Sequence, residues 1–209
     1  MDGCPPATRA HARGRGTFRQ SGFSNTVRGV WGPGLTYTAA RIGHLFPTGA
    51  TEERDVWLHV AVCDAEGKEP QHIPVRPDQS DPNDRYFITS NRKEAFPSHS
   101  SYGSALARDS LPEGDRIYQD VFLDSEGKVT FGQWYAVRIV GNRLEPEETR
   151  EEHYAWSVPS GLSGRDVYLK ASLWYRRMAD SHAEHLDIDR RPHLLVSQDE
   201  RRITVVDGP

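Results

Sequence analysis

The residues best suited to chemistry lie together in one short segment, Trp57-Leu58-His59. Side chains of a β-strand alternate between its two faces, so Trp57 and His59 are neighbours on one face, followed by Ala61 and Cys63. An imidazole in this setting can be one ligand of a copper or zinc ion. It can equally be a structural residue that packs beside the indole and is held by a hydrogen bond.

A metal site at His59 needs further ligands, and His44, His72 and His99 lie in segments that can fold back toward this face. No spacing rule selects among these three. We favour His99, because it belongs to a long polar segment that would otherwise have little structural purpose. If His59 binds a metal ion, the sequence therefore favours His99 as the second ligand.

A second candidate metal site lies near the C-terminus, where His182 and His185 have the i, i+3 spacing of one helical face. The order H-E-x-x-H of zinc hydrolases is missing there, and a polar surface helix explains the same pattern. The chain also contains no C-x-x-C-H haem-attachment motif, no G-x-S-x-G, no P-loop and no G-x-G-x-x-G. We therefore expect no covalently bound haem and no enzyme activity.

Composition narrows the choice of partners. The 209 residues carry a net charge of −4 with both signs interspersed, which favours neither nucleic acid nor an anionic membrane. No run approaches the roughly 18 apolar residues of a membrane span, and the N-terminus lacks the apolar core of a secretory signal. Residues 1–34 are rich in Arg and Gly without a helical or strand period, and we expect a disordered or poorly ordered basic leader there.

The pattern of residues 35–209 predicts one all-β domain, an antiparallel β-sandwich of about eight strands. Two D-x-E-G-K turns, at 64–68 and 124–128, predict two hairpins. A long polar loop is expected from Pro74 to about Asp115, and one short helix over Ser181–Leu186. The predicted strands are Leu35–Arg41, Val56–Cys63, Ile117–Leu123, Val129–Val140, His153–Val158, Val167–Arg176, His193–Val196 and Ile203–Val206.

The turn G-H-L-F-P-T-G at residues 43–49, with E-R-D-V-W-L at 53–58, resembles the β-rich C-terminal module of multihaem c-type cytochromes. Segments 117–122 and 169–176 are similar to later strands of that module. In that family the histidine of this turn can serve as a distal haem ligand. The resemblance therefore implies that His44 is a haem ligand when a haem-bearing partner lies against the turn.

The chain departs from that family because every C-x-x-C-H site is missing. The resemblance then implies a haem-free accessory or split-off C-terminal module for electron transfer. Its partner would be a multihaem cytochrome, or a haem domain encoded upstream and absent from this chain. Redox proteins of this kind work outside the cytoplasm, so the resemblance also implies a periplasmic or cell-surface location.

The W-x-H segment is similar to that of surface copper-binding proteins of methane-oxidising bacteria, in which the tryptophan can be oxidised to kynurenine beside the copper. This second resemblance rests on Trp57-Leu58-His59 alone. It implies, as the alternative function, a copper-binding protein that uses His59, a second histidine such as His99, and Trp57 or its oxidation product.

Overall fold

The largest sheet is built around β4 (Asp55–Cys63), a strand that is buried on both faces. A computed structural model describes residues 26–27, 30–31, 34–39, 43–50, 54–64, 68, 71–90, 111–130, 133–162 and 164–205. In it, β4 pairs antiparallel with β12 (Asp166–Arg176), and β12 pairs antiparallel with β13 (Leu194–Val205). A short parallel strand, β1 (Thr26–Val27), adds to the outer edge of β13.

The other edge of β4 is shared by two short strands. β5 (Gln71–His72) pairs with Ala61 and Val62, whereas β6 (Arg116–Ile117) pairs with Trp57 and Leu58. The middle of β4, at His59, therefore faces the point where these two partners meet.

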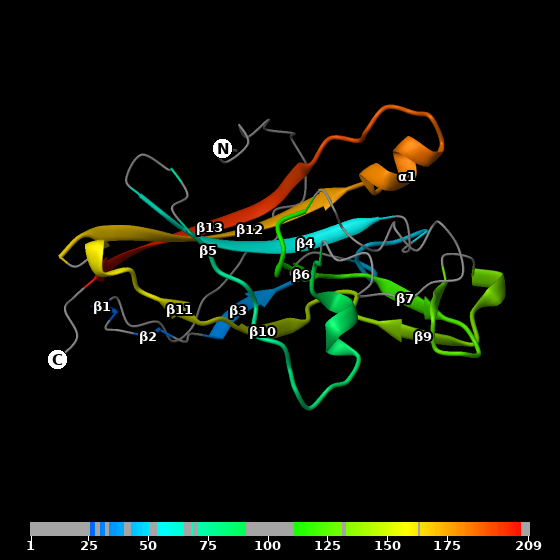
Figure 1. Cartoon of the computed structure of the whole chain (residues 1–209), viewed down its shortest axis with the longest axis horizontal. Helices are drawn as coiled ribbons and strands as arrows, with labels where there is room; N and C mark the ends of the chain where they lie inside the picture. Colours follow the sequence, from blue (N-terminus) through cyan, green and yellow to red (C-terminus); the bar gives the residue numbers. More distant parts are fainter. Residues whose placement is uncertain are drawn as a thin grey trace.

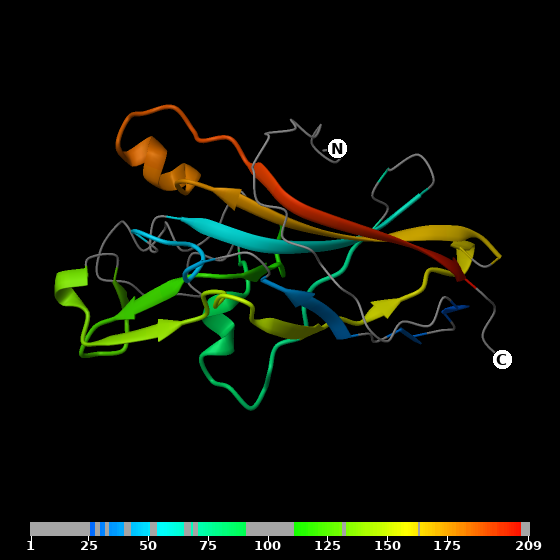
Figure 2. The same ribbon diagram turned by 180° about the vertical axis from the view of Figure 1, so that it is seen from behind.

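Smaller sheets form a second layer beside the large one (Figures 1 and 2). They are β3 (Gly34–Thr38) with β10 (Thr149–His153), β2 (Val30–Trp31) with β11 (Trp156–Ser157), and β7 (Asp120–Leu123) between β8 (Val129–Thr130) and β9 (Arg138–Gly141). Among the described residues, the helical segments are α1 (Asp180–His185) and the 3₁₀ turns η1 (Asp84–Phe87), η4 (Gln133–Tyr135) and η5 (Ser160–Leu162). The predicted all-β class with antiparallel sheets and one short helix is confirmed.

The alternation predicted for β4 is confirmed by its two hydrophobic cores. Val56, Leu58, Val60 and Val62 belong to one core, which also contains side chains of β12 and β13. Trp57 belongs to the other, with Ile117 and with side chains from η1, β7 and β8. Apolar side chains on both faces explain why β4 lies inside its sheet, between β12 and the short strands β5 and β6.

The ends of both predicted D-x-E-G-K turns are joined by backbone hydrogen bonds. The Asp64 N–H donates to Lys68 O at 2.8 Å, and the Asp124 N–H donates to Lys128 O at 2.9 Å. In the second turn Gly127 has a φ of +75°, a conformation that glycine adopts without a steric penalty.

Several predicted strand boundaries were wrong. The segment Ile117–Leu123 is divided between β6 and β7, because the chain leaves β4 after Ile117 and next pairs with β9. The segment Val129–Val140 is β8, η4 and β9 rather than one strand. The two predicted C-terminal strands are one continuous strand, β13, which is polar in its middle and held along its length by β12.

The polar segment from Pro74 to Asp115 is more than a loop in its described part. η1 places Tyr86 and Phe87 in the second core, because these two rings are the apolar residues of an otherwise polar turn. Residues 91–110 lie outside the described residues. Of the predicted leader, Thr26–Val27 and Val30–Trp31 are paired as β1 and β2, and residues 1–25 are not described. Within the described ranges no helix has the length and apolarity needed to cross a membrane.

Candidate metal site

The candidate site forms where β5 and β6 meet along β4. The register pairs Leu58 with Arg116, so Asp115 is the next residue in line and comes opposite His59. His72 lies opposite Ala61, which is on the same face of β4 as His59. Three separate strand positions thus direct one carboxylate and two imidazoles to the same point.

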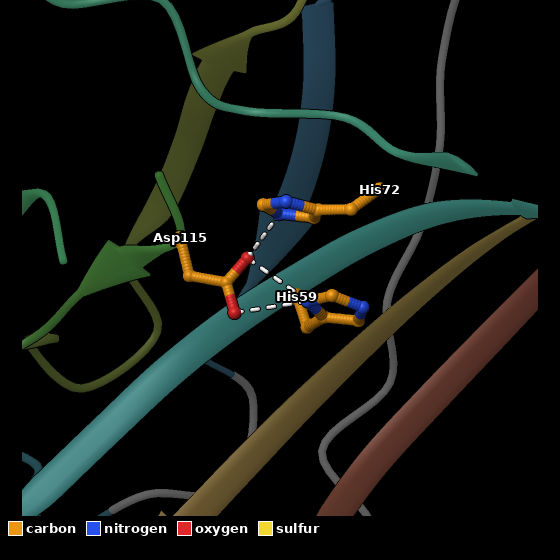
Figure 3. Close-up of side chains that lie close together, drawn as sticks. All are labelled: His59, His72 and Asp115. Carbon is orange, nitrogen blue, oxygen red and sulfur yellow. Dashed lines mark hydrogen bonds and ion pairs between the residues drawn. The ribbon is translucent and has the colours of Figure 1, made fainter. Parts of the chain in front are cut away.

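Asp115 links the two histidines (Figure 3). His59 Nδ1 lies 3.0 and 2.9 Å from the two carboxylate oxygens of Asp115, and His72 Nε2 lies 2.7 Å from Oδ1. Because an ionised carboxylate only accepts hydrogen bonds, both imidazole nitrogens must carry a proton when they bond to it. The two rings are stacked, with centroids 4.7 Å apart and an interplanar angle of 11°.

The backbone around Asp115 is fixed by its neighbours. The Asp115 N–H donates to Thr89 Oγ1 at 2.8 Å, and the Thr89 N–H donates to Asp115 O at 2.9 Å. Gly114 has a φ of +92°, and its carbonyl accepts a hydrogen bond from the Val75 N–H at 2.9 Å. A Cβ at Gly114 would lie 2.6 Å from Pro74 Cβ, so only glycine fits between the two segments. The carboxylate is therefore held in place by backbone contacts as well as by the histidines.

The three side chains differ in their access to water. Asp115 is 1% exposed, whereas His59 is 14% and His72 is 23% exposed. The carboxylate is thus the inner member of the cluster, and both imidazoles reach toward solvent. A buried carboxylate favours a bound cation or a pair of N–H donors, because its charge must be compensated.

The same three groups are a suitable donor set for a transition metal. Their ligand atoms all lie within 4.8 Å of one another. Two ligands about 2.1 Å from one ion are roughly 3.0 to 3.4 Å apart, depending on the geometry. The observed N···O distances of 2.7 to 3.0 Å therefore need only a small expansion to admit an ion. Two imidazoles and a carboxylate suit copper, zinc and iron, whereas magnesium and calcium prefer oxygen ligands alone.

The structure brings only part of the predicted site together. His59 is in the cluster, and its partner is His72, one of the two alternatives to the favoured His99. His99 lies outside the described residues, so its role stays a prediction. His44 lies exposed on the 43–49 turn and is not a member of the cluster.

Trp57 is on the same face of β4 as His59, but its ring is engaged elsewhere. It stacks on Trp174 with centroids 6.3 Å apart, and His193 meets it edge-on at 5.1 Å. Trp57 is 2% exposed. These contacts make Trp57 a core residue next to the cluster, and its proposed role beside copper stays a prediction.

A network of buried charges lies behind the site. Arg116, the residue after Asp115, donates from Nε to Glu152 at 2.8 Å and from Nη1 to Asp84 at 2.5 Å. Burial raises the pKa of Glu152, while the positive charge of Arg116 opposes that rise. The network borders a polar cavity of about 630 Å³, and these paired charges tie β6 to β10 and η1.

The two partners of His59 in the cluster, His72 and Asp115, differ in how far the sequence indicated them. His72 was one of the histidines considered as a second ligand, but the register continued from the Asp64–Lys68 hydrogen bond places Gln71 opposite Ala61. The observed pairing of His72 with Ala61 is shifted by one residue. Asp115 had no local signal, because it is 56 residues from His59 and comes after the segment 91–110. The predicted C-terminal histidine site is not among the described clusters of metal-binding groups: His182 is buried in α1, and the side chain of His185 is not described.

A scan of protein-family models and a search of curated proteins find no match to this chain. Among solved structures, the fold is similar to that of a penta-heme cytochrome c552 from Thermochromatium tepidum, with a TM-score of 0.52 and 18% sequence identity. The similarity covers 82% of this chain and 36% of the cytochrome chain, so this chain spans about a third of that protein. The resemblance to a multihaem cytochrome is thus confirmed for the fold.

Proposed function

We propose that this chain is a metal-binding β module in which His59, His72 and Asp115 hold one divalent transition-metal ion, with Cu(II) preferred. The carrying observation is the buried carboxylate of Asp115 placed between two imidazoles at 2.7 to 3.0 Å. Copper is preferred because Cu(II) binds a given set of nitrogen and oxygen ligands more tightly than the other divalent metals of its row. The module is a binding protein, not an enzyme.

Metal uptake exchanges one set of bonds for another. Without an ion, each histidine uses an N–H to bond to Asp115. With an ion, the same nitrogens supply lone pairs, so the ring protons must leave or move to the other nitrogen. The near-parallel rings must also tilt, because an imidazole lone pair lies in the plane of its ring.

To test this proposal, the full chain is first stripped of metal with a chelator and then titrated with copper. Dialysis removes unbound copper, and elemental analysis measures the copper that remains per chain. We expect about one copper per chain, with an electron paramagnetic resonance spectrum showing nitrogen hyperfine structure. The variant His72→Ala should lose this ion, and His44→Ala, which removes an exposed histidine outside the cluster, should keep it. Retention of copper by His72→Ala, or its loss in the wild type during dialysis, would contradict the proposal.

The similarity to a multihaem cytochrome supports a second candidate function. We infer a haem-free accessory module that lies against a multihaem cytochrome outside the cytoplasm, with His44 available as a haem ligand. His44 suits this role because it is exposed on a turn anchored by Phe46, whose backbone N–H and C=O both bond to Leu144 at 2.9 Å. The chain carries no haem-attachment motif of its own, so the haem must come from the partner.

A haem peptide with one open axial position tests the His44 role directly. Titration with ferric microperoxidase should shift the Soret band as the imidazole binds the iron, and His44→Ala should abolish the shift. His153→Ala is the matched control, because His153 is also exposed. Equal shifts of the Soret band in the wild type and in His44→Ala would show that His44 is not the haem ligand.

A further inference from the structure

Four large apolar side chains are exposed within a stretch of six residues. We name this surface the aromatic edge; it consists of Trp134, Tyr135, Val137 and Ile139, which are 79%, 63%, 69% and 60% exposed. The two aromatic rings contact each other with centroids 5.9 Å apart. Contiguous exposed apolar side chains of this kind are unusual on a monomer and mark an interaction surface.

The backbone beside these side chains is also unpaired on one side. β9 ends the strand order β8-β7-β9, and among the described residues it pairs with β7 alone. The Asn142 N–H donates to Gln119 O at 2.9 Å, so the alternation of an antiparallel ladder turns the backbone groups of Ile139 and Gly141 outward. Edge strands are commonly protected by proline, by several charges or by a bulge, and β9 has only Arg138.

We propose that the aromatic edge binds a second copy of this chain, through antiparallel pairing of β9 with β9. A two-fold axis pairs two identical strands antiparallel, so the antiparallel order of the sheet continues across the contact. Figure 1 shows β7 and β9 at the end of the molecule far from the C-terminus. An axis at Val140 places Ile139 opposite Gly141 of the second copy, and Arg138 opposite Asn142. No like charges then face each other, and the two Ile139 side chains become diagonal neighbours across the contact.

A second copy suits this surface better than a charged partner does. Residues 133–141 contain one charged residue, Arg138, and no acid, so there is little charge for a partner to complement. The four side chains expose on the order of 500 Å² per copy, or about 1,000 Å² in total, the lower limit of a specific interface. We therefore expect a reversible dimer that forms at micromolar concentrations.

Sedimentation velocity on the full chain tests this pairing, from low micromolar concentrations to about 200 µM. A chelator in the buffer excludes dimers joined by a shared metal, which separates this test from that of the metal site. We expect the mass to rise from the 23.6 kDa of one chain toward twice that value. Ile139→Lys should stay at the mass of one chain throughout, because it places a charge at the centre of the contact.

The matched control is Ile188→Lys, which changes another exposed isoleucine, 39% exposed, away from β9. It should dimerise as the wild type does, and Trp134→Ser should dimerise at least tenfold more weakly. A wild-type chain that stays monomeric at all concentrations would overturn the proposal and leave the aromatic edge to a different protein. Equal dimerisation of Ile139→Lys and wild type would overturn it as well.

Discussion

His72 Nε2 lies 2.7 Å from Asp115 Oδ1, although 43 residues separate them in the sequence. The contact joins the end of the first hairpin to the residue that precedes β6. It also brings His72 within ring contact of His59. One carboxylate therefore determines how both imidazoles are presented, and the properties of the site depend most on Asp115.

Replacing Asp115 with asparagine should weaken Cu(II) binding at least about tenfold. The amide keeps the size of the side chain but removes the negative charge that offsets the charge of the ion. Competition with a chelator of known affinity measures the change, and His44→Ala is the control. An unchanged affinity in Asp115→Asn would show that the carboxylate is not a ligand.

Sequence patterns predicted the centre of the fold better than its edges. In β4 the alternating apolar residues are followed by a clear turn signal, and the strand was placed to within one residue of its start. β13 was divided in two because residues 197–202 are all polar and have no apolar alternation. Such a strand is stabilised by the backbone of β12, which the sequence of β13 itself does not reveal.

The candidate site was predictable to the extent that its contacts were local. His59 followed from the alternation of its own strand, whereas His72 was only one of several candidates, because a one-residue shift in the register of the hairpin turns it to the face of His59. Asp115 depends on β6 pairing with the remaining part of the β4 edge, which is a long-range contact with no local pattern. His99 was favoured because it lies in a long loop, an argument about position that gives no register.

Gly114→Ala should destabilise the fold and weaken metal binding. The residue has a φ of +92°, and an added Cβ would lie 2.6 Å from Pro74 Cβ, so the turn that presents Asp115 must shift. We expect a loss of about 1–3 kcal/mol in the free energy of unfolding, measured by urea denaturation.

Gly127→Ala is the matched control for this effect. Gly127 also has a positive φ, +75°, but an added Cβ there meets nothing within 4 Å. It should lose part of the stability and keep the wild-type copper affinity. If both variants bind copper equally well, the position of Gly114 does not matter to the site.

Asp55→Ala should be among the most destabilising single changes. Arg176 is fully buried, and its Nε lies 2.7 Å from Asp55 Oδ2 at directly paired positions of β4 and β12. Asp180 Oδ1, 3.3 Å from Arg176 Nη1, is a weaker second partner. Removing Asp55 leaves a buried charge poorly compensated, which costs about 3–5 kcal/mol in urea denaturation. The exposed pair of Asp166 and Arg202 is the control, and Asp166→Asn should change stability little.

His193 should make the fold less stable in mild acid. His193 lies at the surface with its ring against Trp57, and this partial burial lowers its pKa below the ordinary value of 6.5. The charge of Arg176 lowers the pKa further, while Asp180 and Asp55 oppose the shift. With a lower pKa in the folded state, the unfolded chain binds more protons as the pH falls through about 6.5, so folding loses free energy below that pH. Its contribution should be fully present above pH 7 and decrease below about pH 6.5, down to the pKa of the folded state.

Urea denaturation at a series of pH values measures this contribution. His193→Gln should flatten the dependence of stability on pH below about 6.5, because glutamine cannot take up the proton. The same substitution at exposed His44 is the control for loss of an imidazole. His193 meets the ring of Trp57 edge-on, so His193→Gln will also lose some stability at every pH. The informative quantity is therefore the difference in unfolding free energy between pH 7.5 and pH 5.5, and an equal difference in wild type and His193→Gln would contradict the assignment.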